Sequence, residues 1–359
     1  MITKKRRGDL DIESDPFGER IAATSVRSSL LLMGGRFHFD SNSPELLRLV
    51  DAAYAGLPPH RFSPNPPEFR VRLMLTPGPP RRGRRSPSSR QKSEPPPILM
   101  LSGADLLGSA TESSTFVIVS PQQRSALVSV SREMLRFPYH TRYELIEFAV
   151  FTLASRVQQL APLHAACVGL NGRGILLMGP SGSGKSTVAL HCLLNGFDFL
   201  SEDSVFVAPQ SMRATGTANF LHVRADSLSW FERSAASTLI RQSPIIRRRS
   251  GVEKFEVDLR RAKFHLAKDP LKIIGVAFLS SRSAGKGPLL RPLSQSDAQA
   301  RLKREQAYGA NLPQWQAFSR KLLRLGGVEI LRGTNPSTTV EVLRSVLRHG
   351  IARSARSPA

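Results

Sequence analysis

Hydrophobic positions in the first 160 residues fall into short runs typical of strands and longer runs with helical spacing. Residues 28–40 (SSLLLMGGRFHFD) predict two strands joined at a double glycine, and residues 43–58 (SPELLRLVDAAYAGLP) predict an amphipathic helix. Two more strands are predicted within residues 114–131 and a helix over residues 143–160. We therefore expect residues 1–160 to form a small α/β domain.

The hydrophobic pattern changes character from about Leu163. Two apolar runs within residues 164–179 flank the dipeptide Asn171-Gly172 and predict a hairpin whose second strand leads directly into a glycine-rich loop. A helix over residues 185–194 follows, ended by Asn195-Gly196, and then a short strand.

The remaining segments continue this alternation of element types. Strands are predicted at residues 254–260 and 272–280, and helices in the last forty residues. The alternation of strands and helices indicates an α/β layer fold over residues 161–350, followed by a flexible tail at residues 351–359.

The composition fits a globular protein with a large positive charge. The 359 residues, 40% of them hydrophobic, are enough to bury a core in each of two domains. The formal net charge of +23 favours phosphate-rich or acidic partners without choosing among them. Residues 77–97 are rich in proline and arginine and contain too little apolar surface to fold, so they are predicted to be a disordered insertion. No aromatic residue lies among these arginines, and a dedicated nucleic-acid site is not expected there.

Cysteine content and hydropathy indicate a soluble cytoplasmic protein. Cys167 and Cys192 cannot supply a disulfide framework or a four-ligand zinc site, which favours a reducing compartment. The N-terminal residues lack the apolar region of a signal peptide, and no stretch approaches the roughly 18 apolar residues of a membrane span. We expect no membrane contact.

The glycine-rich loop matches the phosphate-binding pattern G-x-x-x-x-G-K-[ST] in full and lies between a predicted strand and a predicted helix. Backbone N–H groups of such a loop, together with the positive end of the following helix, point at nucleotide phosphates. Lys185 is expected to reach the β- and γ-phosphates and Ser186 to bind Mg²⁺. The residues predicted to bind ATP are Gly179, Pro180, Ser181, Gly182, Ser183, Gly184, Lys185, Ser186 and Thr187.

An acidic pair follows the next predicted strand. The helix rises about 15 Å and the strand about 16 Å, so a right-handed crossover returns the chain to the sheet edge that bears the loop. Glu202 and Asp203 lie at that point, where they can hold Mg²⁺ or accept a proton from an attacking hydroxyl group. The alternative interpretation is that both only solvate the end of a strand.

The segment LHAACVGLNGRGILLMGPSGSGKSTVALHCLLNGFDFLSEDSVFV resembles the HPr kinase/phosphorylase family, in which a histidine, a hairpin, a glycine loop and an acidic pair follow in this order. It is most similar to HPr-kinase-like proteins of bacterial gene clusters, including those similar to lasso-peptide precursor kinases. NFLHVRADSL, IRRRSGVEKFEVDLR and LRGTNPSTTVEVL are also similar to segments of such proteins. The resemblance implies the P-loop core of HPr kinase, related to phosphoenolpyruvate carboxykinase, and ATP-dependent phosphorylation of a hydroxyl group.

The resemblance also implies catalytic roles for individual residues. Asp203 matches the second member of the family's acidic pair and Glu202 the first, where the family usually has aspartate. We favour Asp203 as the base and Glu202 as the residue nearer Mg²⁺, although the reverse assignment stays open. His164 matches the family histidine near the transferred phosphoryl group, and with Lys185 these residues form the predicted catalytic set.

Other positions match the family less closely. Arg249, Ser250 and Lys254 lie in a basic segment that either neutralises phosphoryl oxygens or forms a solvated loop, and the sequence favours neither interpretation. Pro180 stands where bifunctional members typically have aspartate, which argues against phosphorylase activity. The N-terminal region does not resemble the family's regulatory domain, so its role and the oligomeric state, a homo-oligomer included, are left open.

One main hypothesis and two alternatives follow. The main hypothesis is a bacterial kinase that uses ATP and Mg²⁺ to phosphorylate a serine-type hydroxyl group of a small acidic protein or peptide. The first alternative is a P-loop ATPase or nucleotide-dependent switch without a phosphoacceptor. An ABC-type ATPase is disfavoured because the only string like its signature, LSGADLLG, precedes the loop. The second alternative is a basic nucleic-acid-binding protein with a vestigial nucleotide site.

Overall fold

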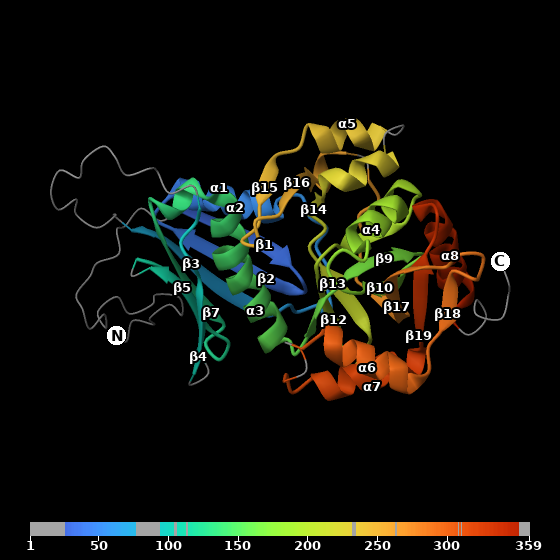
Figure 1. Ribbon diagram of the computed structural model, residues 1–359. Coiled ribbons are helices and arrows are strands. Elements are labelled where there is room, and N and C mark those ends of the chain that lie inside the picture. The colour runs from blue at the N-terminus through green and yellow to red at the C-terminus, as the bar shows by residue number, and fades with distance from the viewer. Residues whose placement is uncertain are drawn as a thin grey trace, which may run out of the picture.

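The computed structural model describes residues 26–76, 94–103, 106–112, 114–231, 235–262, 264–307, 309 and 311–351. They form a mixed α/β protein built on three sheets (Figure 1). Most of the predicted disordered insertion, residues 77–93, and most of the predicted tail, residues 352–359, lie outside the described residues. Residues 94–97 of the insertion are described and contain no helix or strand.

The N-terminal part, residues 26–160, contains a seven-stranded sheet in the order β1-β2-β3-β7-β6-β5-β4. Strands β2, β3 and β7 are parallel, and the remaining neighbours are antiparallel. The predicted hairpin at residues 28–40 is confirmed, with Met33 and Gly34 at positive φ in its turn. The strands are β1 (Val26–Leu32), β2 (Gly35–Ser41), β3 (Glu68–Thr76), β4 (Leu99–Gly103), β5 (Leu106–Glu112), β6 (Thr115–Ser120) and β7 (Ser125–Ser131).

Helices α1 (Pro44–Tyr54) and α3 (Glu147–Val157) pack on this sheet and bury one hydrophobic core with it. The helix predicted over residues 143–160 is part of a longer helical run that begins at Pro138, because proline is favoured in the first turn. The run consists of α2 (Pro138–His140), the π-helical stretch η3 (Thr141–Ile146) and α3, and it follows the short helix η2 (Met134–Arg136). Hydrophobic spacing did not reveal the π-helical stretch.

The C-terminal part, residues 161–351, contains a nine-stranded sheet and a three-stranded sheet. The larger sheet runs β11-β9-β10-β17-β13-β12-β8, with β19 also paired to β17 and β18 paired to β19. Its strands are β8 (Ala161–His164), β9 (Ala166–Leu170), β10 (Arg173–Met178), β11 (Asp198–Ser201), β12 (Ser204–Ala208), β13 (Arg213–Gly216), β17 (Leu271–Ser283), β18 (Leu290–Pro292) and β19 (Gly327–Arg332). The smaller sheet consists of β14 (Phe220–Val223), β16 (Glu253–Asp258) and β15 (Ile245–Arg247).

Helices cover both faces of the larger sheet (Figure 1). Along β10, Ile175 and Leu177 pack in the cluster that contains residues of α4 and α8, while Leu176 and Met178 pack with residues of α6 and α7. This burial on both faces explains the unbroken apolar run of the strand. The helices are α4 (Lys185–Leu194), η4 (Ala225–Phe231), α5 (Ala235–Arg241), η5 (Leu259–Arg261), α6 (Gln295–Glu305), α7 (Trp315–Leu325) and α8 (Pro336–His349).

Strand directions bring the two predicted motifs to one edge of the sheet. β9 is antiparallel to both β10 and β11, so β10 and β11 run in the same direction and end at the same edge. The crossover through α4 therefore returns the chain to the edge of the glycine loop, but it places β11 next to β9 rather than next to β10.

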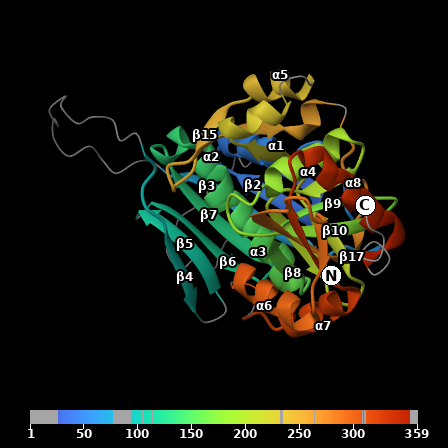
Figure 2. The same cartoon turned by 45° about the vertical axis from the view of Figure 1, so that its right-hand side comes forward.

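The N-terminal and C-terminal parts meet along the run from α2 to α3, which lies between the two large sheets (Figure 2). Phe206 of β12 belongs to the same core cluster as α3, and its ring centroid lies 5.2 Å from that of Phe151. Within the described ranges, no helix has both the length and the apolar character needed to cross a membrane.

Candidate functional site

The glycine loop between β10 and α4 has a backbone that requires glycine. Gly179, Gly182 and Gly184 have φ values of 147°, 82° and 95°, which side-chain-bearing residues rarely adopt. A Cβ atom at Gly179 would also lie 2.6 Å from the carbonyl oxygen of Leu279. Gly184 is the N-cap residue of α4, so the loop leads directly into the positive end of that helix.

Lys185 is held across the loop. Its Nζ donates to the carbonyl oxygens of Gly179 at 2.7 Å and Pro180 at 3.3 Å. Burial lowers the pKa of Lys185 and outweighs the raising effect of the nearby carboxylates, of which Asp203 has the largest. An ammonium group in this position can contact the outer phosphates of a nucleotide in the loop.

Glu202 joins the loop to the end of β11. The Ser186 hydroxyl group donates to Oε1 of Glu202 at 2.5 Å, and Oε2 accepts from the backbone N–H of His222 at 2.8 Å. Nδ1 of His222 lies 3.0 Å from the same Oε2. Burial raises the pKa of Glu202, but the charge and hydrogen bond of His222 outweigh it and hold the pKa below its ordinary value.

Sequence reasoning missed the role of His222. On adjacent strands β14 and β16 it lies directly opposite Glu256, with Nε2 3.4 Å from Oε1 of that residue. Burial lowers the pKa of His222, but Glu202 and Glu256 outweigh burial and raise it to about 9. In the sequence His222 lies between Leu221 and Val223 in a short apolar run, and nothing local identifies its partners.

Asp203 is held by His164 and Arg248. The strand pairing of β8 with β12 sets His164 opposite Ser204, which brings its Nδ1 within 2.9 Å of Oδ1 of Asp203. A guanidinium nitrogen of Arg248 lies 3.4 Å from Oδ2. Burial raises the pKa of Asp203, but the hydrogen bond from His164 and the charge of Arg248 outweigh it and hold the pKa well below its usual range.

Among the basic residues after β15, the structure brings Arg248 rather than Arg249 into the site. Arg249 donates twice to the carboxylate of Glu144, at 2.6 Å in each case, and does not line the cavity beside the loop. Neighbouring side chains in this turn point in different directions, which the sequence does not reveal. Lys254 and Ser250 do line the cavity. Burial lowers the pKa of Lys254.

These groups surround one cavity of about 520 Å³, here called the loop cavity. Most of the predicted nucleotide-binding residues line it, while Gly179 and Pro180 contribute the carbonyl groups that hold Lys185. Basic side chains outnumber acidic ones around it. The polar residues that line it include His164, Ser181, Ser183, Lys185, Ser186, Thr187, Glu202, Asp203, His222, Arg224, Asp226, Arg248, Ser250, Lys254, Arg332 and Asn335.

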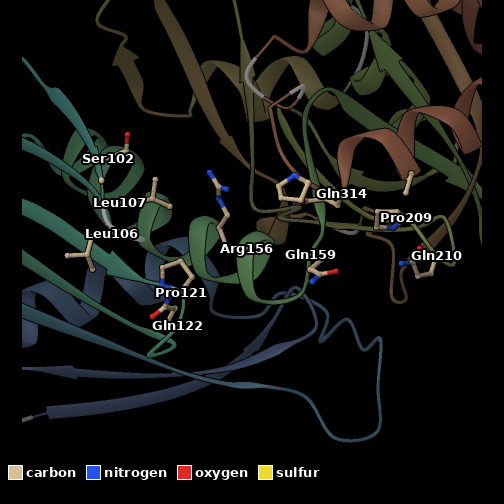
Figure 3. A pocket seen from close by; sticks show the side chains of 13 residues that line it. Ser102, Leu106, Leu107, Pro121, Gln122, Arg156, Gln159, Pro209, Gln210 and Gln314 are labelled. Atoms are coloured by element: carbon tan, nitrogen blue, oxygen red, sulfur yellow. The ribbon is translucent and has the colours of Figure 1, made fainter.

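A second cavity of about 600 Å³ lies near the β4–β5 edge and α7 (Figure 3). Its lining combines apolar side chains such as Leu106 and Leu107 with amides, the hydroxyl group of Ser102 and the cation of Arg156. The part of the chain that the structure describes contributes no acid, histidine or cysteine to this lining. We therefore assign the candidate chemistry to the loop cavity, although it is the smaller of the two.

The donor set of the loop cavity fits Mg²⁺ better than a metal with several protein ligands. Among the described residues no group of three or more His, Cys, Asp and Glu side chains could hold a metal ion. Mg²⁺ needs only one or two protein oxygens because phosphate oxygens and water complete its shell. Ser186 and Glu202 supply such oxygens beside the loop, 2.5 Å apart.

Comparisons with known proteins assign no family. No protein-family model and no curated protein matches this chain. Among solved structures, the Hpr(Ser) kinase/phosphatase from Coxiella burnetii is similar over 51% of this chain and 94% of its own, with 12% sequence identity and a TM-score of 0.26. At that TM-score the likeness supports no conclusion about the site, which rests on the geometry above.

Proposed function

We propose that the protein is a kinase that uses ATP and Mg²⁺ to phosphorylate a serine-type hydroxyl group of a small protein or peptide. One observation carries the proposal: the glycine loop with Lys185, and two carboxylates in different settings, line the same cavity. Glu202 is bonded to Ser186 of the loop, whereas Asp203 is held by His164 and Arg248. Phosphoryl transfer needs a phosphate cradle, a metal ligand and a proton acceptor.

In the proposed reaction the acceptor oxygen forms a bond to the γ-phosphorus atom while the bond from that phosphorus to the β–γ bridging oxygen breaks. ADP leaves with the electron pair of the broken bond, and the proton of the hydroxyl group passes to the carboxylate of Asp203. The low pKa of Asp203 keeps this carboxylate ionised at neutral pH. His164 and Arg248 fix its orientation, which favours transfer from a positioned hydroxyl group.

The remaining charged groups have complementary roles in this proposal. Ser186 and Glu202 would hold Mg²⁺, which when bound neutralises charge on the β- and γ-phosphate oxygens. Lys185 and Lys254 line the cavity and would add positive charge beside the phosphoryl oxygens.

The acceptor proposed here is acidic. Arg224, Lys254 and Arg332 line the loop cavity, and the whole chain carries a formal charge of +23. Such a field raises the local concentration of negatively charged partners and accelerates their association.

Incubation with γ-³²P-labelled ATP, Mg²⁺ and a set of acidic serine-containing peptides tests the proposal. We expect label in peptide with the wild type and with Asp40→Asn, and its loss with Asp203→Asn. Asp40 of β2 lies outside the loop cavity and pairs with Arg27 at 3.0 Å, so it is a control for the loss of a paired aspartate. Release of free phosphate without labelled peptide would favour the ATPase alternative, and absence of Mg-ATP binding by calorimetry would exclude both activities.

A further inference from the structure

The π-helical stretch of the N-terminal part contacts Glu256, which lies behind His222 of the loop cavity. Arg142 of η3 is 6% exposed, and its guanidinium group forms an ion pair with Glu256 of β16. It also lies 3.4 Å from Glu147 and stacks on the ring of Phe220, 4.3 Å from the ring centroid. A π-helical stretch shifts the side chains that follow it around the helix axis, and such stretches occur often at functional sites.

Glu256 connects Arg142 to the loop cavity through His222 and Glu202. Its Oε1 lies 3.4 Å from Nε2 of His222, and Nδ1 of that imidazole lies 3.0 Å from Oε2 of Glu202. The other oxygen of Glu202 accepts from Ser186. Glu256, His222 and Glu202 are each at most 7% exposed, so water cannot readily replace their partners.

A second contact from the same helical run converges on His222. The ring of Tyr139 meets the imidazole edge-on, with the ring centroids 6.0 Å apart. His222 therefore lies between Glu202 and Glu256, and the N-terminal part contacts it directly through Tyr139 and indirectly through the ion pair of Arg142 with Glu256.

We propose that Arg142 is a positioning residue for the loop cavity: through Glu256 and His222 it fixes the orientation in which Glu202 meets Ser186. The inference rests on the proposed function, because it takes Glu202 and Ser186 as the residues that would hold Mg²⁺. It gives the N-terminal part a role in nucleotide binding, although that part supplies no residue of the glycine loop.

Residues behind metal ligands commonly change metal affinity by 10- to 100-fold when they are replaced. Calorimetry with a non-hydrolysable β,γ-imido analogue of ATP, in Mg²⁺ and in EDTA, measures this effect without turnover. We call the ratio of the dissociation constant in EDTA to that in Mg²⁺ the Mg²⁺ effect. For Arg142→Gln we expect this ratio to fall about 10-fold or more relative to the wild type. Binding in EDTA should stay within about threefold of the wild type, since no loop residue changes.

Arg260→Gln is the matched control. Arg260 also joins the two parts, donating to the carbonyl oxygens of Ala52 at 2.7 Å and Ala55 at 3.0 Å, and it stacks over the same Phe220 ring. It contacts neither Glu256 nor His222 in any of the interactions described. We expect this variant to keep the Mg²⁺ effect within about twofold, because loss of an interface arginine alone does not reorient Glu202.

Two further variants keep the test decisive if Arg142→Gln does not fold. Arg142→Lys keeps the positive charge but loses the paired N–H groups with which a guanidinium group binds a carboxylate. Glu256→Gln removes the carboxylate charge that joins Arg142 to His222. Each should lose the Mg²⁺ effect, and Arg142→Lys combined with Glu256→Gln should lose no more than either alone, since residues that act in series are not additive.

The outcomes separate this inference from the proposed function. A wild type that binds the analogue no better in Mg²⁺ than in EDTA overturns both. A wild type with the Mg²⁺ effect, together with Arg142→Lys and Glu256→Gln variants that match Arg260→Gln, overturns the positioning role alone.

Discussion

Asp203 and His164 meet through a contact of 2.9 Å between Oδ1 and Nδ1, although they come from opposite ends of the segment that contains the glycine loop. The contact exists because β8 pairs with β12, which sets His164 opposite Ser204. The histidine is 57% exposed at its side chain, whereas the aspartate is 20% exposed. The imidazole therefore anchors the carboxylate from the solvent side of the cavity, and its removal should leave the carboxylate held by Arg248 alone.

Replacement of His164 by alanine should slow phosphoryl transfer while leaving nucleotide binding nearly intact. The lost hydrogen bond to a charged group is worth about 1.5–3 kcal/mol at most, and exposure reduces this, so we expect about a 10-fold lower kcat. Initial rates with labelled ATP and a peptide that the wild type phosphorylates measure the effect. His265→Ala, at an exposed position outside the loop cavity, serves as the control. Equal rates for wild type and His164→Ala would contradict the anchoring role.

Replacement of Lys185 by methionine should weaken binding of Mg-ATP about 10- to 100-fold, since a charge-assisted contact to phosphate is lost. Methionine retains most of the side-chain length, which limits the structural change. Calorimetry of Mg-ATP binding provides the measurement. Lys272→Met removes an exposed lysine at the start of β17, bonded to the carbonyl oxygen of Ser211, and should bind like the wild type. Unchanged affinity in Lys185→Met would support the vestigial-site alternative.

The same substitution at the neighbouring residues Arg248 and Arg249 should have different effects on kcat. Arg248→Gln removes the cation beside Asp203 and should lower kcat about 10-fold or more. Arg249→Gln removes the ion pair with Glu144, outside the loop cavity, and should keep kcat within about threefold. Loss of this ion pair should instead lower the free energy of unfolding by about 1 kcal/mol. Comparable loss of kcat in both variants would show that the turn acts as a unit.

Glu147 should give the stability of the protein a distinct pH dependence. Burial raises the pKa of Glu147 to about 7, against the lowering effect of Arg142. As pH rises, the carboxyl group of Glu147 loses its proton near pH 4.5 in the unfolded chain but only near pH 7 in the folded protein. Ionisation therefore favours the unfolded chain between these two values, and the free energy of unfolding falls as pH rises from 4.5 through 7. The fall is on the order of 3 kcal/mol, from about 1.4 kcal/mol per pH unit.

Glu147→Gln should lack this fall, so the variant should gain stability relative to the wild type between pH 5 and pH 8. Urea unfolding at intervals across this range measures the difference. In Glu329, by contrast, burial is outweighed by the hydrogen bonds from Arg282 and Arg301 and the pKa is lowered, so its contribution is lost only at acid pH. Because arginines stay charged over this range, Glu329→Gln should show a constant difference from the wild type. A constant difference for Glu147→Gln would contradict the prediction.

Local patterns predicted much of the fold. The hairpin at residues 28–40, the hairpin at residues 164–179 and the helix at residues 185–194 are all confirmed, because each depends on turns, caps and hydrophobic spacing within a few residues. β19 was missed, since its short apolar run within the last forty residues looks like part of a helix.

Long-range pairing could not be predicted in the same way. Insertion of β9 between β10 and β11 follows from sheet assembly, and hydrophobic spacing along one strand does not encode which strand lies beside it. The same limit applies to Arg248 and Arg249, because a turn directs neighbouring side chains differently and local composition is identical for both.

The sequence by itself determined the glycine loop, with Lys185 and Ser186 in it, because that structure depends on the backbone freedom of glycines and on residues within one turn of a helix. Only the tertiary structure decided that His222, Glu256 and Arg142 stand behind Glu202. Those side chains come from a different sheet and from the N-terminal part, and burial of charge is a property of the packed molecule rather than of any segment.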